Sequence, residues 1–319
     1  MTQLAPFLIE PQFVKRIWGY RDLRPWFDKV ASEQPIGEVW LTGDACVVAS
    51  GPQKGMTLAS LFALHAAAML GADAASSDSP LLVKMLFARE KLSVQVHPDD
   101  QLAQKFGEPR GKTECWYALA AQPGAEVALG LKPATTLDAI EQGARNGTLE
   151  EWLEMVPIAT GDMVYVDAGT VHAIWPGSVL LETQQNSDLT YRLYDYGRGR
   201  ELHVAKSLQA VKFKTAAGKV APKVLADRTV LLDAQYFRIE RIEGSGRKTS
   251  AELRRHNGPG LAYLFAAAGS GRIAGDGFED VPLPARGIIA VPATAPEFVL
   301  DDTGGLELIR IVPNRPGQK

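Results

Sequence analysis

The sequence predicts a mainly β fold, built as two jelly-roll-like β-barrels in tandem with helical insertions. Short runs rich in β-branched and aromatic residues recur in the first two thirds of the chain, broken by Gly, Pro and Asp. A second β-rich stretch spans residues 230–312, with glycines at regular intervals. This pattern of short strands and turns favours paired barrels, although its periodicity is equally compatible with one large sandwich. The strand-like runs of the first part occupy residues 38–48, 82–97, 115–131 and 163–193.

Two interruptions between these runs are expected to be helical. Residues 57–70 are rich in Ala and Leu, which favour helix. Residues 135–155 carry apolar residues at helical spacing, with Asn146-Gly147 as a break. Both segments are interpreted as insertions between strands.

The Lys- and Ala-rich segment 212–223 is interpreted as a linker. It divides the chain into a first domain over residues 1–215 and a second over residues 216–319. Between residues 230 and 319 His256 is the only histidine, so the second domain is expected to hold no metal ion.

The composition is that of a globular protein without a global charge bias. The 319 residues are 46% hydrophobic, and 34 basic against 37 acidic residues give a net charge of −3. Nothing global therefore points to a nucleic acid or an anionic membrane as partner. Two cysteines are too few for a disulfide framework, and no basic-then-apolar leader opens the sequence. We expect a cytoplasmic protein with a small-molecule substrate, and the oligomeric state stays open.

The segment Leu92 to Asp100 carries the first candidate site residues. If residues 93–97 form a strand, Ser93, Gln95 and His97 project from one face, because strand side chains alternate. The intervening valines supply a buried opposite face. Three polar groups therefore face water, a cavity or a metal ion.

Two later residues complete a candidate metal site with Gln95 and His97. Glu114 follows at the start of the next expected strand, and His172 comes directly after the turn Gly169-Thr170-Val171. Two neutral imidazoles, one carboxylate and one amide oxygen suit zinc, and manganese, iron and cobalt accept similar ligands. Each residue taken alone also suits an ordinary hydrogen-bonded position. The combination favours a metal site.

Several of these segments resemble the type I phosphomannose isomerases of the cupin superfamily. The similar segments, in order along the chain, are residues 11–19, 36–40, 84–100, 111–117, 168–173 and 181–203. The resemblance covers about the first two thirds of the chain and matches a short bacterial form. It implies a tandem cupin fold and an aldose–ketose isomerase that interconverts mannose 6-phosphate and fructose 6-phosphate in carbohydrate metabolism.

The resemblance also implies roles for individual residues. The metal ligands would be Gln95, His97, Glu114 and His172, holding one zinc or other divalent ion per chain. The catalytic residues would be Arg192 and Glu182, with Lys112 as a further candidate, and the candidates for the proton-shuttling base are Glu182, a metal-bound water and a lysine. Lys84, Ser93 and Lys112 would bind the substrate at its phosphate end. Arg192 has a structural alternative, an ion pair with Asp188 or Asp195.

Two other function classes stay open at this point. One is a non-enzymatic cupin that binds a sugar phosphate, which the lack of a recognisable nucleic-acid module disfavours. The other is a different metal-dependent cupin enzyme, such as a non-haem iron oxygenase, which a fourth ligand at Gln95 disfavours. His65, His203 and His256 are not assigned to the metal.

Overall fold

The computed structural model describes residues 2–28, 32–72, 76–255, 258 and 260–314. The chain is mainly β, as predicted from the sequence. It forms two compact units that are not sequential: one combines residues 1–12, 40–81 and 221–319, and the other combines residues 13–39 and 82–220. No helix among the described residues is long and apolar enough to cross a membrane.

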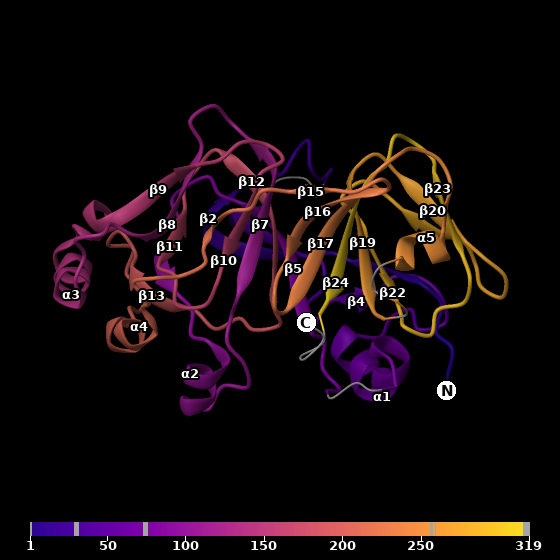
Figure 1. The fold of residues 1–319 in the computed structure, drawn as a ribbon, viewed down its shortest axis with the longest axis horizontal. Helices are drawn as coiled ribbons and strands as arrows, with labels where there is room; N and C mark the ends of the chain where they lie inside the picture. Colours follow the sequence, from indigo (N-terminus) through magenta and orange to yellow (C-terminus); the bar gives the residue numbers. More distant parts are fainter. Residues whose placement is uncertain (1, 29–31, 73–75, 256–257, 259, 315–319) are drawn as a thin grey trace. The chain divides into compact units, whose positions relative to one another are not determined.

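The unit of residues 13–39 and 82–220 contains two sheets. Its seven-stranded sheet has the order β14-β10-β7-β12-β5-β3-β2, and its five-stranded sheet has the order β13-β6-β11-β8-β9 (Figure 1). The strands of the first sheet are Gly218–Lys219, Met163–Val166, Glu114–Ala121, Ser178–Gln185, Leu81–Phe87, Ile36–Trp40 and Gln12–Tyr20; those of the second are Tyr191–Tyr194, Val94–Val96, His172–Ile174, Glu126–Leu131 and Leu153–Pro157.

The two faces of the five-stranded sheet have different neighbours. Val94 and Val96 of β6 pack in a buried cluster with residues of helix α3, such as Ile140. Helices α3 and α4 also contact each other and β13 (Figure 1). Gln95 lines a pocket instead, so the alternation predicted for this segment is confirmed. The helices of this unit are α2 (Asp100–Lys105), α3 (Leu137–Asn146), the 3₁₀ helix η1 (Leu149–Trp152) and α4 (Val204–Ala210).

The other unit contains an eight-stranded sheet in the order β15-β16-β17-β24-β19-β22-β1-β4 and a four-stranded sheet in the order β18-β23-β20-β21. Helices α1 (Leu58–Leu70) and α5 (Ser250–Arg254) belong to it. Its strands are Lys223–Val224, Arg228–Asp233, Phe237–Ile242, Glu307–Pro313, Ala262–Ala268, Ile288–Val291, Phe7–Glu10 and Val47–Val48 in the first sheet, and Lys248–Thr249, Val299–Asp302, Gly271–Ala274 and Val281–Leu283 in the second.

Three sequence expectations differ from this architecture. The N-terminal strand β1 pairs with β22, which brings the start of the chain into the unit that the division at residues 215 and 216 assigned to the C-terminal part alone. In the helical segment expected over residues 135–155, the break at Asn146-Gly147 is confirmed, since α3 ends there and Gly147 is left-handed with φ of 86°. The part beyond the break differs, because only the short 3₁₀ helix η1 follows. Strand β9 takes over from Leu153. The segment 212–223 is not a plain linker, because β14 and the start of β15 pair with β10 and β16.

A buried ion cluster lies in the larger sheet of the C-terminal unit. Glu240 of β17 is 0% exposed and accepts hydrogen bonds from Arg228 at 2.9 Å, Arg310 at 2.7 Å and Arg238 at 2.7 Å. Burial raises the pKa of Glu240, but the three guanidinium groups outweigh burial and hold that pKa below its usual range. The carboxylate is therefore the charge that makes burial of Arg228 and Arg310 tolerable.

We expect Glu240→Gln to lower the free energy of unfolding by about 3 kcal/mol, because it removes the carboxylate that pairs with the buried Arg310 and one of the two carboxylates that pair with the buried Arg228, the other being Asp227 at 3.0 Å. The folded-state pKa of Glu240 is lowered, so its contribution is complete above the unfolded-state pKa of about 4.3 and is lost as pH falls through the folded value. Denaturant unfolding of the wild type and of Glu240→Gln between pH 7 and pH 3 measures this effect. The difference between their free energies of unfolding should narrow toward acid pH.

Glu243→Gln is the matched control, because this carboxylate pairs with Arg241 at 3.0 Å while both side chains stay about 40% exposed. Its effect should stay below about 1 kcal/mol. Equal losses in the two variants would show that the buried cluster contributes no more than a surface pair.

Candidate active site

Three of the predicted metal ligands come together in the unit of residues 13–39 and 82–220. His97 follows β6, Glu114 opens β7 and His172 opens β11. Their ligand atoms all lie within 4.8 Å of one another. All three side chains are at most 1% exposed. Buried charge and imidazole groups in such proximity are characteristic of a metal site.

Two close backbone approaches bring these segments together. At Gly111 a Cβ atom would lie 2.5 Å from the Pro98 carbonyl oxygen, so only glycine lets the segment before Glu114 pass this close to the segment after His97. At Gly169, which has φ of 96°, the backbone N–H donates to the His97 carbonyl at 2.8 Å. The turn expected before His172 is therefore hydrogen-bonded to the segment that carries His97.

The tautomer of His172 tests whether this set of residues fits a cation. Its Nδ1 lies 2.9 Å from the Thr170 carbonyl oxygen, which can only accept, so Nδ1 carries the proton. Burial lowers the pKa of His172, so the ring is neutral and Nε2 presents a lone pair. This Nε2 has no hydrogen-bond partner among the described residues and lies 3.5 Å from Glu114 Oε1. Two facing acceptors repel unless a cation lies between them, so the residues fit a metal ion.

A lysine side chain contacts two of the three predicted ligands. The Lys112 ammonium donates to Glu114 Oε2 at 2.6 Å and lies 3.0 Å from His97 Nε2. Burial and Lys112 together hold the pKa of His97 well below its usual value. Burial raises the pKa of Glu114, but Lys112 outweighs it, so Glu114 is ionised. The donor set is therefore two neutral imidazoles and a carboxylate.

Gln95 lies on β6, between the strands that carry His172 and Arg192. In the five-stranded sheet Gln95 lies opposite His172 of β11 on one side and opposite Arg192 of β13 on the other. Residues directly opposite each other in antiparallel strands project from the same face. Gln95 therefore faces the same way as His172, and its role as a fourth ligand stays a prediction.

A pocket of about 480 Å³ opens beside the three clustered ligands. The candidate residues Lys84, Ser93, Lys112, Glu182 and Arg192 all line it. Its lining has six lysines and arginines but only three carboxylates, in a chain whose net charge is −3. A local excess of positive charge of this kind favours an anionic ligand.

A row of alternately positive and negative side chains runs across the seven-stranded sheet, on the neighbouring strands β2, β3, β5 and β12. Arg16 donates to Glu38 at 2.8 Å, Lys84 lies 4.0 Å from Glu38 and 3.0 Å from Glu182, and Lys112 lies 3.7 Å from Glu182. We call these five residues the charge ladder. Each of its three inner side chains has an oppositely charged partner on both sides.

The ladder also shifts the pKa values of two of its members, Lys84 and Glu182. Burial lowers the pKa of Lys84, but Glu182 and Glu38 outweigh burial and hold that pKa above its usual range. Burial and the Glu114 carboxylate raise the pKa of Glu182, and Lys84 and Lys112 oppose that rise. The pKa of Glu182 is raised overall, which suits a carboxylate that exchanges a proton.

Arg192 makes no ion pair with Asp188 or Asp195 among the described residues. Asp195 instead pairs with Arg198 and Arg200. Arg192 Nη1 donates to the Glu201 carbonyl at 2.9 Å, and its Nε is buried without a partner in the part of the chain that the structure describes. The guanidinium therefore keeps an unused donor. The structural alternative considered from the sequence was an ion pair with Asp188 or Asp195, which the described residues do not form.

Four charged pocket residues were not singled out from the sequence as site residues: Lys15, Arg16, Glu38 and Arg200. All four lie in segments that resemble the family, and that resemblance was the signal that could have identified them. Of the unassigned histidines, His65 lies in α1 and His203 accepts from the Arg192 backbone N–H at 3.1 Å. His256 lies outside the described residues.

Comparisons with known proteins give a consistent result. A family model for the catalytic domain of type I phosphomannose isomerase matches residues 7–142. A mannose-6-phosphate isomerase of Streptococcus mutans is 35% identical over 320 residues, covering 95% of this chain and 97% of the relative. Mannose-6-phosphate isomerase ManA of Bacillus subtilis is 38% identical over 266 residues, covering 78% of this chain and 82% of the relative.

Solved structures are similar as well. The crystal structure of the mannose 6-phosphate isomerase from Bacillus subtilis has a TM-score of 0.84 and 31% identity, covering 97% of this chain and 99% of that chain. The structure of a putative mannosephosphate isomerase from Archaeoglobus fulgidus has a TM-score of 0.79 at 19% identity. The second likeness bears on the fold alone.

Proposed function

Because the chain belongs to the type I phosphomannose isomerase family and is therefore an isomerase, we propose that it interconverts mannose 6-phosphate and fructose 6-phosphate. The observation that carries this proposal is the convergence of His97, Glu114 and His172 at a pocket with excess positive charge. The Streptococcus mutans relative, which is named for this activity, matches 95% of the chain. We place the reaction in carbohydrate metabolism in the cytoplasm.

The metal ion would be held by His97, Glu114 and His172, with Gln95 as the fourth ligand. We propose zinc, because the set is rich in imidazole and has one carboxylate. When bound, such an ion acts as a Lewis acid on substrate oxygens. The unit that contains residues 221–319 would hold no metal ion.

The phosphate supplies binding energy remote from the reacting carbons. Lys84, Ser93 and Lys112 would orient the substrate, as the resemblance implies. Lys84 and Lys112 both pair with Glu182 of the charge ladder, and Lys112 also contacts His97 and Glu114. We infer that these two lysines act nearer the sugar oxygens, while Arg200 adds positive charge elsewhere in the pocket.

The chemical step moves one proton from C2 to C1 through a cis-enediolate, while the hydroxyl proton passes from O2 to O1, so that hydroxyl and carbonyl exchange places. We propose that Glu182 takes the proton from C2 of the open-chain aldose and returns it to C1, which yields the ketose. Its buried position on β12, held by Lys84 at 3.0 Å, fixes the carboxylate for this transfer. Lys112 is the alternative proton carrier. Arg192 would stabilise the negative charge that develops on oxygen.

Incubation of the purified protein with mannose 6-phosphate tests this proposal. We expect fructose 6-phosphate to form, and the reverse conversion to reach the same equilibrium mixture, measured by NMR of the reaction. Binding of the sugar phosphate without conversion would point to a binding protein instead. Consumption of dioxygen with an oxidised product would point to an oxygenase.

A further inference from the structure

A second pocket lies in the unit of residues 13–39 and 82–220 and shares no lining residue with the active-site pocket. Its volume is about 270 Å³. It is formed where β2, β5 and β7 end and β12 begins, by residues such as Tyr20, Phe87, Ala120 and Ser178. The proposed isomerisation uses none of these residues.

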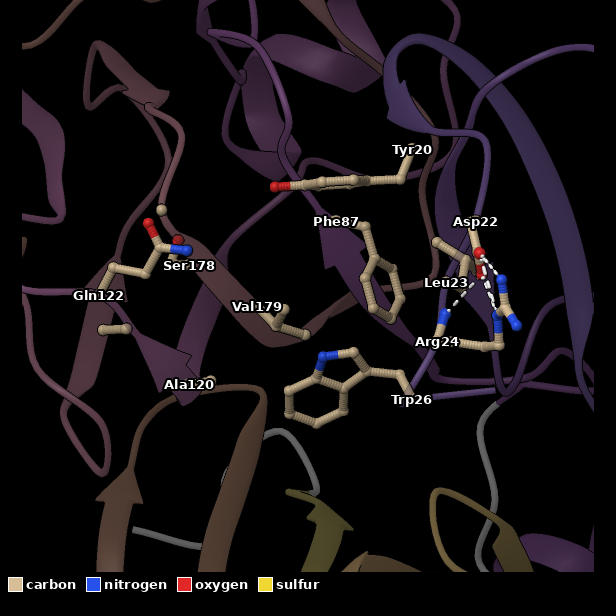
Figure 2. Close-up of a pocket in the computed structure, with 12 residues that line it drawn as sticks. Tyr20, Asp22, Leu23, Arg24, Trp26, Phe87, Ala120, Gln122, Ser178 and Val179 are labelled. Carbon is tan, nitrogen blue, oxygen red and sulfur yellow. Dashed lines mark hydrogen bonds and ion pairs between the residues drawn. The ribbon is translucent and has the colours of Figure 1, made fainter. Parts of the chain in front are cut away.

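Three aromatic side chains bound this pocket. Figure 2 shows the Tyr20 ring on one side of the space and the Trp26 indole across from it, with Phe87 between them. Trp26 and Phe87 pack edge to face, with centroids 6.2 Å apart and an interplanar angle of 72°. The small residues Ala120 and Gly177 also line the pocket and leave room beside the rings. Such rings offer apolar faces at a fixed spacing to a ligand of ring size.

The charged groups of the pocket neutralise each other. Asp22 accepts from Arg24 Nε at 2.9 Å and from the Arg24 backbone N–H at 3.0 Å, and no other lining residue is ionised. A phosphate ester would find no unpaired cation here, and an ammonium ligand would find no unpaired carboxylate. The lining therefore selects for a neutral ligand, in contrast to the cationic active-site pocket.

Polar groups face the rings from the other side. The Ser178 hydroxyl is buried, in a residue that is 6% exposed, and has no hydrogen-bond partner among the described residues. Figure 2 shows the hydroxyl end of Tyr20 pointing toward the side where Ser178 and the Gln122 amide lie. An unpaired buried hydroxyl is costly, so a ligand hydroxyl that paired with Ser178 would be favoured.

We propose that this pocket binds a neutral, unphosphorylated monosaccharide. The C–H faces of a pyranose ring would pack on Tyr20 and Trp26. Its hydroxyls would hydrogen-bond to Ser178, Gln122 and the Tyr20 hydroxyl. The site is a second ligand site beside the catalytic one, and its occupancy does not depend on the proposed isomerase activity.

Binding of methyl α-mannopyranoside, which is neutral and cannot be isomerised, tests this proposal by calorimetry and by saturation-transfer NMR. We expect millimolar affinity that Tyr20→Ala weakens about tenfold, because a stacked ring contributes roughly 1.4 kcal/mol. Tyr20→Phe, which keeps the ring, should weaken binding less. Gln122→Ala, at an exposed position, should weaken it severalfold without risk to folding.

Two controls distinguish binding in this pocket from binding in the active site. Arg192→Lys should leave the affinity for the mannoside unchanged, and saturating mannose 6-phosphate should not displace it. Displacement by mannose 6-phosphate, affinity unchanged in Tyr20→Ala and Gln122→Ala, absence of binding, or tighter binding of choline than of the mannoside would each overturn the proposal.

Discussion

Replacement of His172 by alanine is expected to remove the bound metal ion and to lower isomerase turnover by at least two orders of magnitude. The imidazole is oriented by the Thr170 carbonyl, so that its Nε2 lone pair faces the Glu114 carboxylate. Alanine leaves the carboxylate with one imidazole fewer, and an incomplete ligand set binds metal weakly. His97→Ala should behave in the same way. Metal content and turnover measured on the same preparation check both.

His65→Ala is the matched control, since it makes the same chemical change in helix α1, which belongs to the other unit. It should keep both metal and turnover. A His172→Ala protein that retains its metal and its activity would remove His172 from the site. Loss of activity with full metal content would instead assign His172 a role other than metal binding.

Arg192→Lys is expected to lower turnover by on the order of a hundredfold while changing substrate affinity much less. Lysine keeps the positive charge but loses the planar fork that can donate to an oxygen from two nitrogens. Only an interaction that is stronger in the transition state accelerates the reaction, so the loss should appear in kcat rather than in KM. Steady-state kinetics with mannose 6-phosphate measure the two separately.

Arg145→Lys makes the same change on the exposed face of α3, where the guanidinium pairs with Glu141. Turnover of that control should be unchanged. A lower melting temperature of Arg192→Lys with near-normal kcat would show that Arg192 braces the strand and does not act on the substrate. Metal content should be normal in both variants.

The local features of the site were predictable because they follow from alternation and spacing. The alternation of residues 93–97 placed Gln95 on the pocket side and Val94 on the helix side, as found. The turn before His172 was recognisable from Gly169. Helix α1 was also expected, and it begins after the N-cap residue Thr57 as the Ala- and Leu-rich composition suggested.

The long-range features were not predictable from local patterns. Pairing of β1 with β22 depends on residues about 280 positions apart, such as Phe7 opposite Ala290, and no local periodicity encodes it. The charge ladder joins Arg16 to Glu38 across two strands in the same way. The break expected at Asn146-Gly147 is where helix α3 ends, but the helical expectation for the residues beyond it was wrong. After the short 3₁₀ helix η1, the chain from Leu153 forms strand β9, whose pairing with β8 is not encoded by local spacing.

Titration of the metal-free protein with zinc, following turnover of mannose 6-phosphate and bound metal together, tests the central claim most directly. If His97, Glu114 and His172 hold the ion that the reaction requires, turnover should start near zero, rise in proportion to bound metal and level off at one ion per chain. Full turnover in protein shown to contain no metal would contradict the account, as would a requirement for a second ion in the unit that contains residues 221–319.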